Sequence, residues 1–315
     1  MIHILYENAD WLPPLTRALT ARGLEFDLHF VDGGAFEVCE APPPGVYVNR
    51  MSPSAHTRGH GDGVVYVREY LAVLETYGRR VVNGTEAYAL EISKVRQHAA
   101  LEVFGIVTPR TIAVAGRGAL KTAARGMPTP FITKHNQGGK GLGVRLFRDL
   151  DAFDAYVDGE EFEPAFDGIT LLQQYIEPPE PFITRVEIVD GQFQYAIRAS
   201  TAQGFELCPA VACQADDAFC PVGDTGKFGL SPLTAEDPIV QSYIAFCAAH
   251  RIDVAGIEFV EGRDGRRYTY DVNMNTNYNA EVEASHKLDG MAAIAALCER
   301  ELALLAQTPN SESAA

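Results

Sequence analysis

The sequence predicts an α/β protein with more than one lobe, and three features of the chain support this fold class. The N-terminus has a strand–helix–strand pattern, which is typical of a parallel sheet. Two later stretches each pair short apolar runs across a tight turn, which predicts antiparallel β-hairpins. The length of 315 residues suggests two domains, or one domain with distinct lobes.

The composition is that of an ordinary globular protein, with 47% hydrophobic and 22% charged residues. The net charge of −16 argues against nucleic acid and anionic membrane surfaces as partners, so an anionic substrate would need a local basic pocket. The first residues, MIHILYENADW, carry acids where a signal peptide would carry basic residues. No apolar run approaches the ~20 residues of a membrane span. These features predict a cytoplasmic protein.

The six cysteines are expected to be reduced thiols, as is usual in a cytosolic chain of this size. Cys208, Cys213 and Cys220 form a loose cluster. Their spacing lacks the CxxC pattern of a zinc site, and no fourth ligand is obvious, so a structural metal is disfavoured there.

The first segment of the chain predicts the parallel sheet. Residues 2–6 and 25–30 have the pattern of strands, and residues 11–22 between them have the pattern of a helix that ends at Gly23. The turn Asn83-Gly84 follows a further short strand, so we expect the first domain to span residues 1–84.

A strand over residues 46–49 runs directly into polar residues. Ligands of open α/β sheets bind at the carboxyl ends of the strands. Arg50 and Ser54 are therefore candidate substrate contacts, Arg50 for a carboxylate. For Ser54 the alternative is a hydroxyl that only stabilises its own loop.

A glycine-rich loop joins two predicted strands in PFITKHNQGGKGLGVRLF. Glycines let backbone N–H groups approach a phosphate closely, and Lys140 among them supplies positive charge. The loop lacks the GK[ST] of a Walker motif, and a strand rather than a helix follows it. The pattern indicates a flap over nucleotide phosphates; the alternative is a mobile surface hairpin.

The apolar strand predicted over residues 169–176 ends in the proline-rich break EPPEPF. A strand that ends in this way can act as a hinge, where backbone N–H and C=O groups could bind the edge of an adenine. Glu180 could reach a ribose, or could be a solvated acid.

Asp190-Gly191 between two apolar runs predicts a type I′ hairpin. Arg185 and Arg198 lie on its two strands, where an arginine near phosphates would act as a fixed cation.

A second hairpin is predicted over residues 255–272, around the turn GRDG. The period of two places Thr269, Asp271 and Asn273 on one face of their strand, toward which Glu258 can converge. Oxygen ligands of this kind hold Mg²⁺ together with substrate phosphates. The alternative is a hairpin whose polar residues only face water.

In this order, the motifs resemble the ATP-grasp superfamily and, within it, the RimK-like ligases. The segments that carry the resemblance are VVNG with SKVRQHAALEVFGIVTPRTIAV, PFITKHNQGGKGLGV, LLQQYIEP, FITRVEIVDGQFQYAIRAS and GIEFVEGRDGRRYTYDVNMN, which together cover residues 81–283. Each motif alone is weak, but five in the right order and spacing are specific. The resemblance implies the ATP-grasp fold: a pre-ATP-grasp domain (1–84), a central lobe (85–170) and a C-terminal lobe (171–306). The last residues, 307–315, are expected to form a disordered tail.

The resemblance also implies roles for individual residues. It implies a catalytic role for Arg198, which would face the transferring phosphate, and magnesium ligands in Glu258, Asp271 and Asn273. The implied ATP contacts are Lys94, Lys134, Gly139, Lys140, Gly141, Gln174, Tyr175, Ile176, Glu180 and Arg185. Asn275 joins Arg50 and Ser54 as a candidate substrate contact. The chain departs from the family pattern in two places. Ile183 stands where an acid that binds the ribose is usual, and GFELCPA replaces the segment that usually contributes to the acceptor pocket.

The expected activity is ATP-dependent ligation of a carboxylate to an amine through an acyl phosphate, with Mg²⁺ or Mn²⁺ as the metal. The expected substrates are small molecules or peptides, and the resemblance implies a homodimer or homotetramer. Two alternatives remain: a kinase-like phosphotransferase, and a non-catalytic nucleotide-binding module. A Rossmann oxidoreductase is disfavoured because the first strand–helix turn, YENADW, has no glycine.

Overall fold

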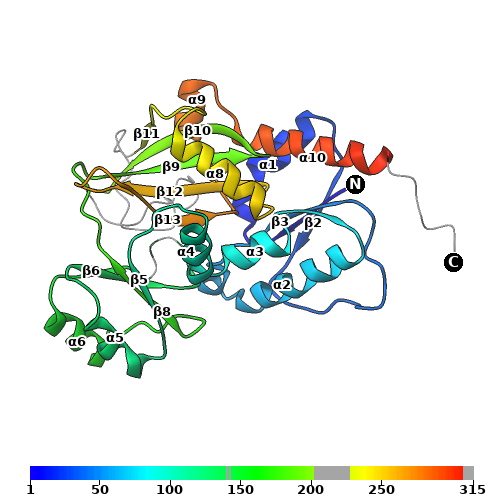
Figure 1. The fold of residues 1–315 in the computed structure, drawn as a ribbon. Helices are drawn as coiled ribbons and strands as arrows, with labels where there is room; N and C mark the ends of the chain where they lie inside the picture. Colours follow the sequence, from blue (N-terminus) through cyan, green and yellow to red (C-terminus); the bar gives the residue numbers. More distant parts are fainter. Residues whose placement is uncertain (140, 142, 202–227, 308–315) are drawn as a thin grey trace.

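The computed structural model describes residues 1–139, 141, 143–201 and 228–307. Within these ranges the chain forms three β-sheets, one of four strands near the N-terminus, one of four strands in the middle of the chain and one of five strands nearer the C-terminus. Figure 1 shows the middle sheet, with β5, β6 and β8, set apart at the lower left of the molecule. Two predicted features lie outside the described residues. They are Cys208, Cys213 and Cys220, and Lys140 of the glycine-rich loop.

The N-terminal sheet is parallel, as predicted, with the strand order β2-β1-β3-β4. Its strands are β1 (Ile2–Tyr6), β2 (Phe26–Phe30), β3 (Val46–Arg50) and β4 (Arg80–Val82). The helices α1 (Pro13–Ala21) and α2 (Gly61–Thr76) pack on opposite faces, because the alternating residues of β1 enter two different hydrophobic clusters. Ile2 and Ile4 face α1, whereas Leu5 faces α2.

The middle sheet is antiparallel, with the order β5-β8-β6-β7. Its strands are β5 (Thr111–Ala115), β6 (Phe131–His135), β7 (Arg145–Phe147) and β8 (Ile169–Gln174). The short helices α5 (Leu120–Ala124) and α6 (Leu150–Asp158) cover one face through a cluster centred on Phe131 and Phe153. Because β8 belongs to this sheet, the lobe boundary expected between residues 170 and 171 falls inside a strand.

The C-terminal sheet has the order β11-β10-β9-β12-β13. Its strands are β9 (Phe182–Val189), β10 (Gln192–Ser200), β11 (Phe228–Leu230), β12 (Val254–Glu261) and β13 (Arg267–Asn273). Asp190 and Gly191 both have positive φ, 55° and 66°, as the predicted type I′ turn requires. Helix α8 (Pro238–Ala249) packs on the face that carries Ile257 and Phe259.

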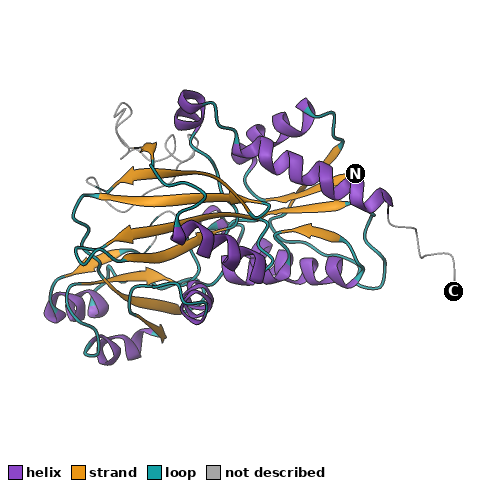
Figure 2. Cartoon of the chain, turned by 45° about the horizontal axis from the view of Figure 1, so that its top comes forward, coloured by secondary structure: helices purple, strands orange, loops and turns teal. Residues whose placement is uncertain are grey.

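Two of the remaining helices lie between the N-terminal and middle sheets in the chain, and two follow the C-terminal sheet. They are α3 (Thr85–Glu91), α4 (Lys94–Val103), α9 (Ala280–His286) and α10 (Gly290–Gln307), with short 3-10 turns at Ala9–Trp11, Ala55–Arg58 and Arg117–Ala119. Helix α10 lies beside α1, and one hydrophobic cluster contains buried residues of the N-terminal sheet, of β9, β10 and β12, and of α10. In Figure 2 the strands run through the middle of the molecule and the helices lie on the outside. None of the helices in the described ranges is long and apolar enough to cross a bilayer.

Candidate active site

A cleft lies where the middle sheet, the C-terminal sheet and the carboxyl end of β3 meet. Strands β6 and β8 supply one wall, strands β9, β12 and β13 supply the other, and the segment that follows β3 closes one end. Of the residues predicted to form the site, those that line the cleft are Ser54, Lys94, Lys134, Gly139, Gly141, Gln174, Tyr175, Ile176, Arg185, Glu258, Asp271, Asn273 and Asn275.

The predicted acids meet on neighbouring strands. Glu258 on β12 and Asp271 on β13 are direct cross-strand partners, and Asn273 pairs with Gly256 one step further along. The side-chain nitrogen Nδ2 of Asn273 donates a hydrogen bond to Gly256 O over 3.4 Å. The two carboxylates and this amide therefore lie side by side on the face that lines the cleft.

A β-bulge in β13, opposite the step from Glu258 to Phe259, leaves Tyr270 unpaired and alters the face of the β13 residues beyond it. Thr269 was predicted to share a face with Asp271, and this was wrong: Thr269 pairs with Phe259, and its hydroxyl lies 2.6 Å from the Tyr243 hydroxyl of α8. Tyr270 takes the place in the cleft instead. The period of two fails here because a bulge inserts one extra residue into the strand.

Cations compensate the two acids. Asp271 forms an ion pair with Lys94 Nζ. Burial acts to raise the pKa of Asp271, but Lys94 and Lys134 outweigh it and hold that pKa below its usual value. Burial raises the pKa of Glu258, although Arg185 opposes the shift.

Arg185 lies within a buried network on the floor of the cleft. Its guanidinium donates to Glu187 over 2.6 Å and to Glu258 over 2.9 Å, and it also donates to the hydroxyl of Thr276. A Cβ atom at Gly256 would lie 2.3 Å from Arg185 Nη2, so only glycine lets the guanidinium cross β12 at this point.

Asp271 and Glu258 partly compensate the charge of Lys134, but neither is close enough to form an ion pair with it. Its Nζ lies 3.4 Å from Tyr270 O and 5.0 Å from the centre of the Tyr270 ring. No carboxylate of the described residues forms an ion pair with it. Burial, and then the neighbouring charge of Lys94, lower the pKa of Lys134 to about 8.

The glycine-rich segment forms the predicted hairpin, since β6 and β7 pair in antiparallel fashion. A Cβ atom at Gly139 would lie 3.7 Å from that of Ser54, so the hairpin approaches the segment after β3. Gly143 has a φ of +68°, and a Cβ there would lie 2.3 Å from the ring of His135. His135 therefore packs beneath the hairpin, and its Nε2 lies 3.2 Å from Glu163 O.

The end of β8, where the sequence predicts a hinge, lines the cleft. Gln174 N donates to Arg110 O over 2.8 Å, and Tyr175 N donates to Pro130 O over 3.3 Å, so these two amides already have partners in the sheet. The next residue, Ile176, also lines the cleft.

Two predicted residues lie elsewhere. Arg198 does not line the cleft: it pairs with Thr184, on the opposite face of β9 from Arg185, and its guanidinium lies 4.3 Å from the centre of the Phe182 ring. A bulge between Phe193 and Tyr195 shifts the register by one residue and so changes the face on which Arg198 lies. Glu180 is exposed and shares a separate surface hollow with Arg198.

Arg50 is also absent from the cleft lining of the described residues, for a different reason. Its buried guanidinium donates to Thr276 O and to Asn277 Oδ1, each over 2.8 Å. The backbone oxygen of Arg50 accepts a hydrogen bond from Asn275 Nδ2 over 2.8 Å. Arg50 thus holds the loop that follows β13, which carries Asn275 and Asn277 into the cleft.

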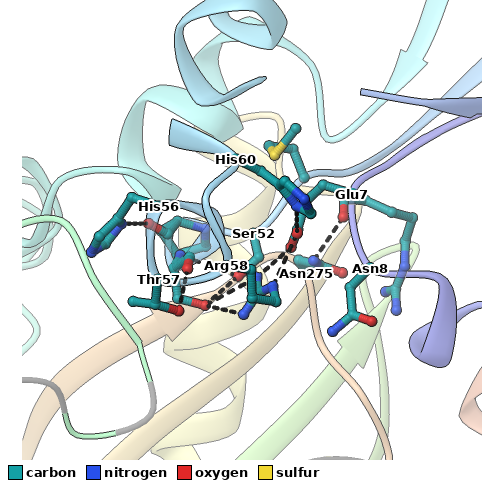
Figure 3. A network of polar contacts seen from close by, with 12 residues as sticks. Glu7, Asn8, Ser52, His56, Thr57, Arg58, His60 and Asn275 are labelled. Carbon is teal, nitrogen blue, oxygen red and sulfur yellow. Dashed lines mark hydrogen bonds and ion pairs between the residues drawn. The ribbon is translucent and has the colours of Figure 1, made fainter. Parts of the chain in front are cut away.

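A polar network that includes Ser52, Arg58, His60 and Glu7 lies at the end of the cleft (Figure 3). The hydroxyls of Ser52 and Ser54 lie 2.9 Å apart, and Arg58 Nη1 lies 3.4 Å from Ser54 Oγ. Arg58 also binds the buried carboxylate of Glu7, with Nε to Oε2 at 3.0 Å, and His60 lies 3.1 Å from the same oxygen. Glu7 follows the last residue of β1, so the network lies at the carboxyl end of the parallel sheet.

Sequence reasoning missed several residues that line the cleft, among them Trp11, Glu91, Tyr270 and Asn277. Glu91 ends α3 and accepts a hydrogen bond from Met274 N over 2.6 Å, and burial raises its pKa to about 7. An acid after the apolar run AYAL was a signal that could have identified it. Tyr270 could not be found from the alternation alone, because of the bulge.

Comparison with known proteins gives structural neighbours only. No family model and no curated protein matches the chain. The chain is similar to a RimK-domain ATP-grasp protein from Sphaerobacter thermophilus DSM 20745, with 18% identity, a TM-score of 0.64, and coverage of 94% of this chain and 98% of that one.

Two further solved structures have the same architecture. D-cycloserine synthetase DcsG is 18% identical, with a TM-score of 0.65 and coverage of 95% and 99%. ATP-grasp ligase PsnB, complexed with a minimal precursor, is 16% identical, with a TM-score of 0.66 and coverage of 95% and 98%. With three sheets in the expected order and matches over nearly the whole length of these chains, the protein has the ATP-grasp fold.

Proposed function

We propose that the protein is an ATP-dependent carboxylate–amine ligase that works through an acyl phosphate and releases ADP and phosphate. The observation that carries this proposal is the charge arrangement of the cleft. Lys94, Lys134 and Arg185 gather beside the carboxyl groups of Glu91, Glu258 and Asp271, beneath a glycine-rich hairpin. Cations beside oxygen ligands suit a polyphosphate that is bound together with a divalent metal.

The donor atoms of the cleft fit Mg²⁺. Glu258, Asp271 and Asn273 offer carboxylate and amide oxygens from adjacent strands, and Mg²⁺ is commonly held by one or two carboxylates plus substrate phosphates. Mn²⁺ prefers the same kind of ligands. When bound, the metal would neutralise charge on the nucleotide phosphates during transfer.

Lys134 is the residue proposed to bind the phosphates most directly. It is buried and has no carboxylate partner among the described ion pairs, so a phosphate oxygen would provide its missing counter-charge. Lys94 already neutralises Asp271 and would share that role with the metal. The backbone of Gly139 and Gly141, with Lys140 between them, would cover the phosphates.

The adenine is proposed to bind at the end of β8. The amides of Gln174 and Tyr175 are engaged in the sheet, which leaves the backbone of Ile176 and the carbonyls of the hinge as candidate contacts. Glu180 lies outside the cleft, so the ribose contact is not assigned to it.

The carboxylate substrate is proposed to lie between the nucleotide and the N-terminal sheet. Ser54, Asn275 and Asn277 line that end, and Arg50 positions the two asparagines. Transfer of the γ-phosphoryl group to a carboxylate oxygen gives an acyl phosphate and ADP. An amine then attacks the acyl carbon, the carbon–oxygen bond to phosphate breaks, and the amine loses a proton. Phosphoryl transfer depends mainly on positioning and charge neutralisation, so no nucleophilic side chain is required.

The screening experiment follows from this chemistry. The full chain is incubated with Mg-ATP and pools of amino acids and peptides, and ADP, free phosphate and product mass are measured together. Peptides belong in the pools because the neighbour PsnB is complexed with a precursor peptide in one structure. A ligase forms ADP and free phosphate in equal amounts, with a product lighter by one water than its two substrates.

The matched control is Asp271→Asn, which keeps the side-chain shape and removes the charge. It should abolish product formation while Asp264→Asn, in an exposed turn, should not. A phosphorylated product without free phosphate would instead identify a phosphotransferase. Unchanged turnover in Asp271→Asn would refute the assignment of the acids. A homodimer or homotetramer remains a prediction, which light scattering would test.

A further inference from the structure

A second cluster of metal-ligating side chains lies away from the cleft, at the other end of the parallel sheet. His3, near the start of β1, and Asp27 and His29, on the edge strand β2, each offer one ligand atom, and these atoms all lie within 4.8 Å of one another. His3 Nδ1 is 3.1 Å from His29 Nε2 and 3.9 Å from Asp27 Oδ2. We propose that these three side chains form a site for a divalent transition metal such as Zn²⁺.

The imidazole of His3 is fixed on several sides. The ring of Tyr47 stacks on it, with ring centres 4.6 Å apart. The backbone of Gly45 packs against its edge so closely that a Cβ there would lie 2.9 Å from the ring. His3 Nε2 lies 3.4 Å from Pro44 O, which accepts a hydrogen bond from it when Nε2 carries the proton.

This second hydrogen bond determines which nitrogen is available. A metal-binding histidine usually donates its other ring N–H to a carbonyl or carboxylate, which fixes both the tautomer and the orientation of the ring. With the proton on Nε2, the lone pair of Nδ1 points toward His29 and Asp27. Burial lowers the pKa of His3, which keeps the ring in the neutral form that binds metals.

The distances fit a tetrahedral ion with a vacant position. Zn–N bonds of ~2.0–2.1 Å place neighbouring ligand atoms roughly 3.3 Å apart. The two histidine nitrogens are already at 3.1 Å. Asp27 needs a small rotation, which its 57% exposed side chain can make. Two imidazoles and one carboxylate suit zinc or a similar transition metal better than Mg²⁺.

The alternative is a simple hydrogen bond, in which His29 Nε2–H donates to His3 Nδ1 and Asp27 is solvated. Substituting His29→Gln separates the two possibilities. A glutamine amide can still donate to His3 Nδ1, but it is a poor ligand for zinc. His286→Gln, which removes an exposed histidine of α9, is the matched control.

The test uses Co²⁺ as a spectroscopic substitute for Zn²⁺, added to the full chain without a histidine tag in saturating Mg²⁺. The expected result is one Co²⁺ per chain with the intense visible absorption of tetrahedral coordination, no thiolate-to-metal band, and release of Co²⁺ by Zn²⁺. His286→Gln should keep this spectrum, whereas His29→Gln should lose it and Asp27→Asn, which removes the charged ligand, should bind Co²⁺ more weakly than the parent chain.

Metal-free thermal unfolding of His29→Gln should match that of the parent chain, which shows that the loss of binding is not a loss of folding. The proposal is overturned if the parent chain gives no tetrahedral spectrum, or if His29→Gln gives the same spectrum and affinity. A thiolate band would also overturn it, because it would place the ion on cysteine.

Discussion

Replacing Lys134 with methionine should stabilise the nucleotide-free protein while abolishing ATP binding. Lys134 is buried, and its pKa is about 8 rather than the usual 10.5. Holding the charge there costs folding free energy, since one pKa unit corresponds to about 1.4 kcal/mol. The difference therefore corresponds to as much as about 3 kcal/mol, which Lys134→Met would recover because methionine fills similar space without a charge.

The sign of the pH dependence follows from linkage. Below pH 8 the lysine is protonated in both the folded and unfolded states, so the full cost is present. Between pH 8 and 10.5 the folded state gives up its proton first, and the cost disappears. The stability advantage of Lys134→Met should thus be greatest at or below neutral pH and should vanish as the pH rises through this window.

Urea unfolding from pH 6.5 to 9.5 measures this advantage, and calorimetric titration with Mg-ATP measures binding. Lys287→Met, an exposed lysine at the end of α9, should change stability by no more than about 0.5 kcal/mol. If Lys134→Met lowers the stability of the nucleotide-free protein at pH 7, the ammonium is already compensated, and its assignment to phosphate loses its physical basis.

Three further substitutions test other parts of the site. Gly256→Ala should destabilise the protein by about 3–5 kcal/mol, because it displaces Arg185 from a buried ion pair. Denaturant unfolding measures this loss of stability. Gly118→Ala is the neutral control, because the space around its Cα is open. Arg198→Ala should leave kcat and the KM for ATP unchanged, because the side chain lies on the far face of the sheet; a ~10²-fold fall in kcat would contradict that placement. Arg50→Met should raise the KM of the carboxylate substrate more than that of ATP in steady-state assays, because it releases the loop carrying Asn275 and Asn277.

Much of the fold could be predicted from the sequence because hydrophobic alternation and turn chemistry are local signals. Strand β1 has the predicted bounds, and Asp190-Gly191 forms the predicted turn. The convergence of Glu258 with Asp271 was predicted from the same alternation and is confirmed by their cross-strand pairing.

The placement of Thr269 failed at a β-bulge, and a second bulge decides the face of Arg198, whose catalytic role was expected from the family resemblance and not from alternation. Without the bulge in β10, the tight turn would pair Arg198 with Ile183 and place it on the face that lines the cleft; the extra residue pairs it with Thr184 instead. The bulge beside Glu258 exchanges Thr269 for Tyr270 in the same way. Strand β13 contains no glycine that would announce the extra residue Tyr270, so a period of two carried along this strand gives the wrong face for Thr269.

The role of Arg50 could not be predicted for a different reason. Its position at the carboxyl end of a strand was identified, but its partners are the backbone of Thr276 and the side chain of Asn277, more than 200 residues later in the chain. Whether an arginine at such a position meets a substrate or a loop depends on tertiary packing, which the local sequence does not encode.

The shared core of the first and last parts of the chain has a consequence for engineering. One cluster contains side chains of β1, β3 and α1 together with those of β10, β12 and α10, whereas the buried cluster of the middle sheet contains only residues from Val114 to Leu172. The N-terminal segment therefore cannot be deleted to leave a smaller catalytic unit, because its removal would expose the inner face of α10. The middle sheet, in contrast, has the organisation of an exchangeable module, inserted between two halves of a body that is discontinuous in sequence, and a lobe from a relative could be grafted at its two connections.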